Sequence, residues 1–266
     1  MSLPHFYLEQ QVLADETGEH IGLRLSADDA RHFKVLRLKA GEHIAVIDAA
    51  RDYFECEITD PNWDAPEVRI CSHEADIVAG PSVVLFQGLA KSDKLDTIVR
   101  QATEVGVSGV VAVPFARSVV SLDERHGATR LARWETIVKN AAMQSGRRTI
   151  PEVALLTGVD DLEPYLAGAT CTLIFWEEAP TDADFAEPLA RALATEFCPA
   201  ADARVAIIIG PEGGLEATEV ERIKAMTKHP AVVTLGSTIL RTETAGVVAP
   251  ALVIHELNRL AKGSPA

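Results

Sequence analysis

Short apolar runs alternate with helix-length amphipathic stretches along residues 82–266. The runs predict six strands, at 82–87, 108–115, 151–156, 171–177, 204–209 and 231–235. The run at 204–209 is apolar after its first residue, as expected for a strand that is buried on both faces of a sheet. Strands that alternate with helices predict an α/β domain with a mostly parallel sheet, in which ligands bind beyond the carboxyl ends of the strands.

Two of the intervening stretches have clear helical periodicity. In 92–105, Ser92 is a candidate N-cap and Gly106 a stop, and one face carries Leu95, Ile98, Val99, Ala102 and Val105. In 126–145, the apolar side holds Leu131, Trp134, Ile137, Val138, Ala141 and Ala142. A last helix is expected from about residue 242 to residue 260. It includes Pro250, which should kink the helix or remove one backbone hydrogen bond.

Residues 1–75 instead predict a small β-rich domain. Short apolar or alternating runs occur at 5–8, 22–25, 43–49 and 53–58, with turn-like segments between them. One helix is expected at 28–38, with Ser26 as a possible N-cap and Phe33 on its apolar face. Residues 74–81 are interpreted as a linker, so two domains are predicted, at 1–75 and 76–266.

The chain is acidic overall, but its charge is unevenly distributed. It has 25 Lys and Arg residues against 39 Asp and Glu, a net charge of −14, which by itself argues against a nucleic-acid partner. Residues 76–150, however, carry 10 basic and 7 acidic side chains, and the run 31–39 has four positive charges and no acid. Arg31, Lys34 and Arg37 are therefore candidate RNA contacts, with an ordinary solvated helix face as the alternative.

Local spacings typical of metal sites or serine nucleophiles are absent from the sequence. The four cysteines form no CxxC pair, the two His-Glu steps lack the second histidine of HExxH, and no GxSxG occurs. We therefore expect no metal, and free cysteines in a reducing cytoplasm. No apolar run reaches the ~18 to 20 residues of a membrane span, and the first residues lack a signal-peptide pattern, so no membrane association is expected.

The first loop with candidate chemistry is 209–215. It follows the apolar run at 204–209 and contains Gly210, Gly213 and Gly214, which let backbone N–H groups approach a ligand, together with Glu212. It is neither a Walker loop nor GxGxxG, and a tight strand-to-helix turn is the alternative. The absence of GxGxxG also argues against a nicotinamide oxidoreductase.

The second loop, 235–245, opens the last helix. Thr242 is a plausible N-cap, and Glu243 would then lie in the first turn, where the helix dipole favours an acid. Arg241 gains nothing from that dipole, so something else should require it, such as a carboxylate, a phosphate or an RNA base.

A third segment, 140–148, ends the 126–145 helix. Arg147 and Arg148 follow Gly146, and they either complement the carboxyl end of the helix or face phosphates.

Together these segments resemble the ribosomal RNA small-subunit methyltransferase E family of SPOUT enzymes. The resemblance rests on GPEGG after an apolar strand, LGxxILRTETA some twenty residues later, AAMQSGRR, the block 88–120 and DDARHFKVLRLKAGEHI, and it spans about residues 6–260. It implies a PUA-like RNA-binding β-barrel at 1–75 and a SPOUT methyltransferase domain at 76–266. It also implies a C-terminal trefoil knot and a homodimer packed through the knotted region.

The resemblance further implies S-adenosyl-L-methionine as the cofactor and N3 of a uridine in 16S rRNA of the small ribosomal subunit as the methyl acceptor. The implied cofactor residues are Ile209, Gly210, Glu212, Gly213, Gly214, Leu235, Gly236, Ile239, Leu240 and Arg241. The implied RNA contacts are Arg31, Lys34, Arg37, Lys91, Arg147 and Arg148. Two alternatives stay open: a SPOUT ribose 2′-O-methyltransferase on rRNA or tRNA, and a non-catalytic RNA-binding assembly factor.

Uracil N3 is a poor nucleophile until its proton leaves, and this sets the chemical demand on the site. We expect Arg241 to stabilise the developing negative charge, or to hold a phosphate or the methionine carboxylate. Glu212 and Glu243 are expected to orient Arg241. Either carboxylate can act as the base only if burial raises its pKa.

Overall fold

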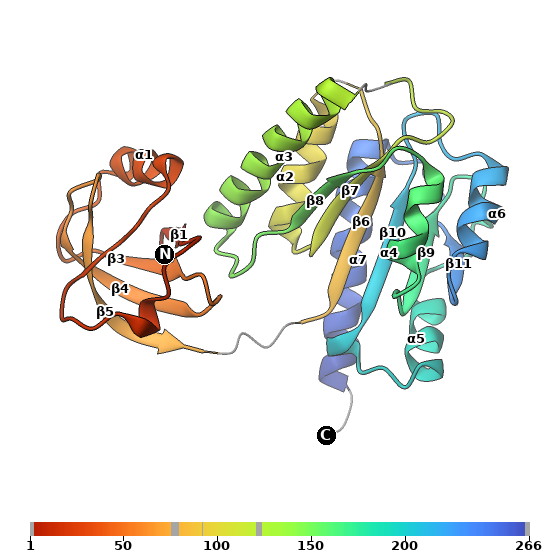
Figure 1. The fold of residues 1–266 in the computed structure, drawn as a ribbon. Helices are drawn as coiled ribbons and strands as arrows, with labels where there is room; N and C mark the ends of the chain where they lie inside the picture. Colours follow the sequence, from red (N-terminus) through yellow and green to blue (C-terminus); the bar gives the residue numbers. More distant parts are fainter. Residues whose placement is uncertain (1–2, 76–79, 92, 121–123, 264–266) are drawn as a thin grey trace. The chain divides into compact units, whose positions relative to one another are not determined.

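The chain folds into two compact units in the computed structural model, which describes residues 3–75, 80–91, 93–120 and 124–263. Unit 1 consists of residues 1–78 and 142–149, and unit 2 of residues 79–141 and 150–266. Figure 1 gives the elements of both units in chain order. The linker expected at 74–81 lies partly outside the described residues, and the candidate N-cap Ser92 lies outside them altogether.

Unit 1 is built on a five-stranded sheet with the strand order β1-β3-β4-β5-β2. The strands are β1 (His5–Tyr7), β2 (Ile21–Gly22), β3 (His43–Ile47), β4 (Tyr53–Asp60) and β5 (Glu67–Glu74). β1 runs parallel to β3, and the other pairs are antiparallel. Side chains alternate along β4, so Phe54, Cys56 and Ile58 enter the core while Glu55 and Glu57 lie on the opposite face.

The runs predicted at 5–8, 43–49 and 53–58 coincide with β1, β3 and β4, and the helix of this unit is present as well. The run predicted at 22–25 overlaps β2 only at Gly22. β5 escapes prediction because only Val68 is fully buried and Ile70 partly so, and the exposed residues 71–74 leave too short a hydrophobic alternation to identify a strand. Helix α1 (Ala27–Leu36) begins after Ser26, whose side chain accepts a hydrogen bond from the Asp29 N–H, and this N-cap prediction is confirmed. α1 buries Phe33 and ends at Arg37, which is left-handed with φ 52°.

Unit 1 also includes the end of α3 (Glu124–Ser145) and the residues that follow it. Ala142 and Met143 belong to the same buried cluster as Phe6. The Tyr7 hydroxyl donates a hydrogen bond to the carbonyl of Arg147 at 2.6 Å. Helical periodicity could not reveal this division, because it reports which side of a helix is apolar and not which core that side enters.

Unit 2 is an α/β domain on a six-stranded, all-parallel sheet with the order β11-β9-β10-β6-β7-β8. The strands are β6 (Ser82–Gly88), β7 (Gly109–Val113), β8 (Glu152–Leu155), β9 (Cys171–Phe175), β10 (Arg204–Ile209) and β11 (Pro230–Val233). All six predicted strands are present, although several are shorter than predicted. The predicted fold class, an α/β domain with a parallel sheet, is confirmed.

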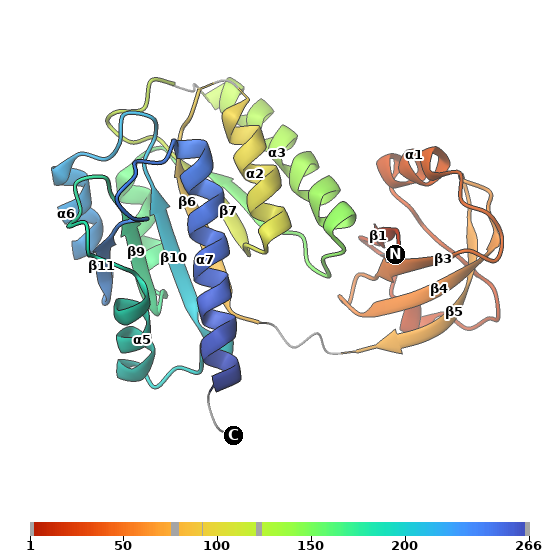
Figure 2. The ribbon, with the colours of Figure 1, turned by 180° about the vertical axis from the view of Figure 1, so that it is seen from behind.

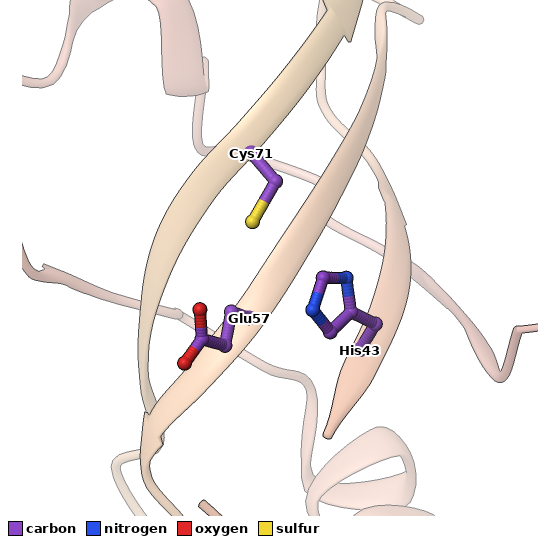
Figure 3. Close-up of side chains that lie close together, drawn as sticks. All are labelled: His43, Glu57 and Cys71. Carbon is purple, nitrogen blue, oxygen red and sulfur yellow. The ribbon is translucent and has the colours of Figure 1, made fainter. Parts of the chain in front are cut away.

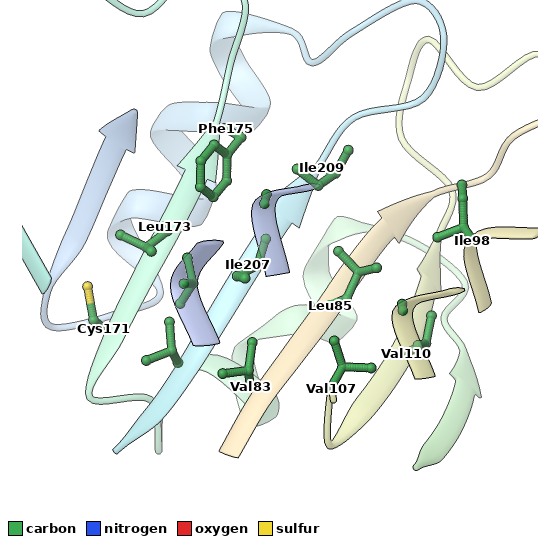
Figure 4. Packing of buried hydrophobic residues seen from close by; sticks show 14 of the residues in the cluster. Val83, Leu85, Ile98, Val107, Val110, Cys171, Leu173, Phe175, Ile207 and Ile209 are labelled. Carbon is green, nitrogen blue, oxygen red and sulfur yellow. The ribbon is translucent and has the colours of Figure 1, made fainter. Parts of the chain in front are cut away.

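Helices cover both faces of the unit 2 sheet. They are α2 (Lys94–Val105), α3, α4 (Glu163–Leu166), α5 (Ala186–Thr195), α6 (Ala217–Ala225) and α7 (Thr242–Gly263). Ile207 and Ile209 of β10 pack in the cluster formed with α2, α5 and α7 (Figure 4), whereas Ala206 and Ile208 face α4 and α6. The prediction that this strand is buried on both faces is confirmed.

Helix α7 runs through Pro250 without ending and lies across β6 and β10 (Figure 2). Proline has no N–H, so the carbonyl of Gly246 lacks the helical bond that residue 250 would otherwise donate, as the sequence predicts. Among the helices of the described residues, none has the length and apolar character needed to cross a bilayer.

Candidate functional site

A cavity of about 730 Å³ opens at the carboxyl edge of the unit 2 sheet. β10 and β11 both flank β9, so the loops that follow these two strands meet beyond its end. All ten residues expected to bind the cofactor line this cavity: Ile209, Gly210, Glu212, Gly213, Gly214, Leu235, Gly236, Ile239, Leu240 and Arg241. Glu243 lines it as well. The structure therefore brings the two predicted loops together around one space.

Sequence reasoning missed several side chains of the cavity wall, and three of them are polar or charged groups of interest. Trp176 and Glu177 follow β9, and Lys94 begins α2. The Trp176 indole N–H donates to the carbonyl of Leu215 at 3.2 Å. The rule that ligands bind at the carboxyl ends of parallel strands pointed to the end of β9 as well, so this signal was available. No sequence signal linked Lys94 to Glu243, because 149 positions separate them.

Glycine is required at two close approaches around the first loop. Gly214 has φ +74°, and a Cβ there would overlap the carboxylate of Glu177. Gly88, the last residue of β6, lies so close to the backbone of Pro211 that a Cβ would overlap it too. A larger residue at Gly88 must displace backbone, and one at Gly214 must adopt a left-handed conformation that side chains rarely take, so glycine is favoured at both positions.

The buried side chain of Gln87 connects both loops to the end of β6. Its amide N–H donates to the Thr242 hydroxyl at 2.8 Å, and that hydroxyl donates to the Gly210 carbonyl at 2.7 Å. Helix α7 begins at Thr242 itself, so Thr242 is not its N-cap and this prediction is wrong. The Arg241 carbonyl accepts the first helical bond, from the Ala245 N–H, so Arg241 occupies the capping position.

Lys94 forms ion pairs with the acidic residues of both loops. Its Nζ lies 3.1 Å from an oxygen of Glu243 and 3.3 Å from an oxygen of Glu212. The backbone N–H of Lys91 donates to the same Glu212 oxygen at 3.1 Å. The two carboxylates therefore contact Lys94 and not Arg241, which they were predicted to orient.

Both carboxylates are held in the ionised form. Burial raises the pKa of Glu212, but the backbone N–H groups of Glu212 and Lys91, together with Lys94, outweigh it and leave the pKa below its ordinary value. The backbone N–H of Glu243 lowers the pKa of that residue, and Lys94 and Arg241 lower it further against a smaller effect of burial. A general base needs a raised pKa, so the condition set for either carboxylate to act as one is not met.

Arg241 lines the same cavity with an exposed side chain. Within the described part of the chain it forms no ion pair, and its charge acts on Glu243 only at a distance. The cavity therefore contains two cations. Lys94 is paired with two carboxylates, whereas Arg241 is available to an incoming anion. This arrangement fits the expectation that an external group accounts for Arg241.

The predicted RNA contacts fall into two groups. Arg31, Lys34 and Arg37 are exposed on or just after α1, where Arg31 pairs with Asp28 at 3.0 Å and Lys34 Nζ lies 4.3 Å from the ring centre of Trp63. In this way the structure adds an aromatic ring to a basic helix.

In the second group, Arg147 and Arg148 are less available to phosphates. Arg148 pairs with Glu74 and lies over the ring of Tyr53 at 4.4 Å. Burial lowers the pKa of the Arg147 guanidinium. Lys91, in unit 2, is exposed and follows the end of β6. The exposed charges of α1 are therefore the stronger candidates for RNA contact in unit 1.

Comparison with known proteins agrees with a parallel α/β domain that carries a glycine-rich cavity at its carboxyl edge. The family described as RNA methyltransferase domain matches residues 79–254, and the one described as RNA methyltransferase PUA domain matches residues 25–71. The chain therefore belongs to the RNA methyltransferases. Within them it belongs to the family of ribosomal RNA small subunit methyltransferase E, whose curated members resemble it over most of its length.

Two curated relatives and one solved structure illustrate the likeness. Ribosomal RNA small subunit methyltransferase E of Bacillus subtilis is 30% identical over 241 residues, covering 89% of this chain and 91% of the relative. The Mycobacterium tuberculosis protein of the same name is 29% identical over 221 residues, covering 81% and 79%. The crystal structure of the Neisseria gonorrhoeae protein of that name, bound to S-adenosyl methionine, superposes with a TM-score of 0.74 at 26% identity and covers 94% of this chain and 96% of its own.

Proposed function

We propose that the chain transfers a methyl group from S-adenosyl-L-methionine to N3 of a uridine in 16S rRNA of the small ribosomal subunit. The observation that carries this proposal is the cavity itself. Two loops from the sheet edge surround about 730 Å³, a size within the usual range for small-molecule sites. The relative from Neisseria gonorrhoeae binds the proposed cofactor, and the curated relatives are named for the proposed substrate.

The residues of the cavity suit this cofactor. The glycines at 210, 213 and 214 leave backbone groups accessible, and Phe175, Ile209 and Leu235 offer apolar walls for an adenine ring. The three carboxylates of Glu177, Glu212 and Glu243 outnumber the two cations of the cavity, so one net negative charge is left to favour a cationic ligand over a neutral one. S-Adenosylmethionine supplies a methyl group on a positively charged sulfur, ready for an in-line displacement.

The chain itself must make uracil N3 nucleophilic. In our proposal Arg241 stabilises the negative charge that develops on the uracil ring as the N3 proton passes to water. Glu212 and Glu243 stay ionised and hold Lys94, which joins the two loops at a fixed separation. The positions of the reacting groups are then set by the rigid strand ends of β6, β9 and β10 rather than by flexible side chains.

We assign RNA binding mainly to unit 1 and methyl transfer to unit 2, with the domain boundary near residue 75. In this assignment unit 1 is a PUA-like β-barrel and unit 2 a SPOUT domain. The loop 235–241 and helix α7 complete a trefoil knot and contribute to a homodimer. Exposed Leu252 and Ile239 in this region support a partner surface. The setting proposed for the reaction is the cytoplasm, where small-subunit rRNA is modified.

The decisive experiment uses the purified full-length chain, labelled S-adenosylmethionine and small ribosomal subunits from a strain that lacks this gene. We expect label in 3-methyluridine when the nucleosides are separated by mass spectrometry. Large subunits serve as the substrate control and should remain unlabelled. Label on a ribose 2′-oxygen would replace the proposal with that alternative, and a protein that fails to bind the cofactor in calorimetry would be an assembly factor.

A further inference from the structure

Three potential metal ligands lie together on the outer face of the unit 1 sheet. His43 on β3 is directly opposite Glu57 on β4, and Cys71 lies on β5, the next strand (Figure 3). One ligand atom from each residue lies within 4.8 Å of the other two. His43 and Glu57 are half-buried and Cys71 is exposed, so solvent ions can reach all three.

A β-bulge brings the cysteine to this face. Glu55 pairs with Ser72 and Cys56 pairs with Ile70, so Cys71 is an extra residue that has no partner opposite it on β4. Such an insertion interrupts the strict alternation of side chains and changes the direction of the inserted one. Glu55 and Glu57 of β4 face outward and Cys56 faces inward. The extra residue on β5 lets Cys71 lie beside Glu57 on the outward face.

The imidazole of His43 is already oriented for a ligand. Its Nδ1 lies 2.7 Å from an oxygen of Glu55. Figure 3 shows the other edge of the ring turned toward Glu57 and Cys71. A histidine whose one ring nitrogen is held by a carboxylate while the other faces further ligands is the arrangement that carboxylates give to metal-binding histidines.

We propose that His43, Glu57 and Cys71 bind one divalent cation of the zinc class. A nitrogen, a sulfur and a carboxylate oxygen are the ligands that Zn²⁺ takes, and a water molecule would complete four-fold coordination at the open side. The Cys71 thiol gives up its proton to the buffer as the zinc–sulfur bond forms. The bound ion would then connect β3, β4 and β5.

One basic side chain competes with the cation. The guanidinium of Arg69 lies 2.5 Å from a Glu57 oxygen, and both side chains are at the surface. Metal binding must displace this arginine or leave it to share the carboxylate. Short ligand spacings in the sequence do not reveal this site, because successive ligands are 14 residues apart along the chain and only the pairing of neighbouring strands brings them together. The expectation of no metal rested on those short spacings.

The proposal is tested by titrating the full-length chain with Zn²⁺ in calorimetry and with Co²⁺ in absorption spectroscopy, where a thiolate ligand produces a charge-transfer band. We expect one ion per chain. Cys71→Ser should abolish the Co²⁺ band, and His43→Ala should weaken Zn²⁺ binding strongly. Glu55→Gln should weaken it by about 10- to 100-fold, as loss of an orienting partner does. Arg69→Gln should tighten binding, because it removes the competing cation.

Matched controls are Cys198→Ser, which removes a partly exposed thiol elsewhere, and Glu67→Gln, which removes an acid of β5 outside the site. Both should bind like the parent chain. Circular dichroism of each variant checks that the sheet remains folded. Binding that survives Cys71→Ser unchanged, or that follows Cys198, would overturn the site. Zinc binding does not depend on methyl transfer. A chain that methylates small subunits but binds no ion would overturn only the zinc site, and a chain that binds the ion but does not methylate would overturn only the proposed function.

Discussion

The two sheets of this chain carry their polar groups in different places. In unit 2, helices cover both faces, and the charged side chains Lys94, Glu212 and Glu243 gather at the carboxyl edge. In unit 1, the outer face of β3, β4 and β5 stays partly exposed and carries pairs such as His43 with Glu55. A parallel sheet with buried faces leaves only its edge for chemistry, whereas an antiparallel sheet can use a whole face.

The largest effect is expected from Arg241→Ala at the cavity. Removing the one cation that is available to an anion should lower the single-turnover rate by about 10²- to 10³-fold, as loss of an electrostatic stabiliser does. Cofactor affinity in calorimetry should change little. Arg241→Lys, which keeps the charge without the fork of donors, should fall between the two. Collapse of cofactor binding with a normal rate at saturation would reassign Arg241 to the cofactor.

A second change tests how tightly the edge of the unit 2 sheet is packed. In Gly246→Ala the new Cβ would lie 2.5 Å from Gln87 Oε1 and 3.0 Å from Ile98, so either the buried Gln87 side chain or helix α7 must shift. Overpacking of this kind costs about 1–3 kcal/mol of unfolding free energy. Urea unfolding of the single variants and of Gly246→Ala combined with Gln87→Ala measures the coupling. Strict additivity of the two changes would contradict the close contact.

The third change addresses the basic helix of unit 1. Lys34→Ala combined with Arg37→Ala should weaken binding to small-subunit rRNA. It should also reduce the slope of log affinity against log salt by about two, roughly one for each lost phosphate contact. Lys228→Ala, on the acidic unit 2, is the matched control and should leave the slope unchanged. If the double variant keeps the parent slope, RNA binds elsewhere.

The smallest effect should come from Lys94→Met, which removes the cation shared by Glu212 and Glu243. The pKa of both carboxyls is lowered in the folded chain, so their pairing stabilises it at neutral pH, and this contribution is lost as the pH falls below their ordinary value of 4.5. The pKa of Lys94 is raised, so the same contribution also fades as the pH rises above 10.5.

The difference in urea midpoint between parent and Lys94→Met should therefore be greatest between these two pH limits and shrink outside them. Lys224→Met breaks an exposed pair with Glu221 and serves as the control. A difference that is independent of pH would mean that Lys94 acts through packing alone.

Prediction from sequence succeeded where the local pattern reports burial directly. β10 is apolar because both of its faces are covered, and its predicted bounds agree with the structure. The same physics explains the failure at β5, where one exposed face leaves a largely polar strand. The loops of the cavity were predicted because clustered glycines allow a ligand to approach the backbone, and because an arginine beside a helix N-terminus gains nothing from the helix dipole. Lys94 and Gln87 were missed because their partners lie more than a hundred residues away.

The inclusion of residues 142–149 in unit 1 has a consequence for how the protein is made. The core that begins with Phe6 is completed by Ala142 and Met143, which the ribosome adds after more than half of the chain has been synthesised. Until then the amino-terminal sheet lacks part of its apolar cover. A fragment that stops at residue 78 would keep that deficit permanently, so the order of synthesis and the order of folding cannot coincide for this unit.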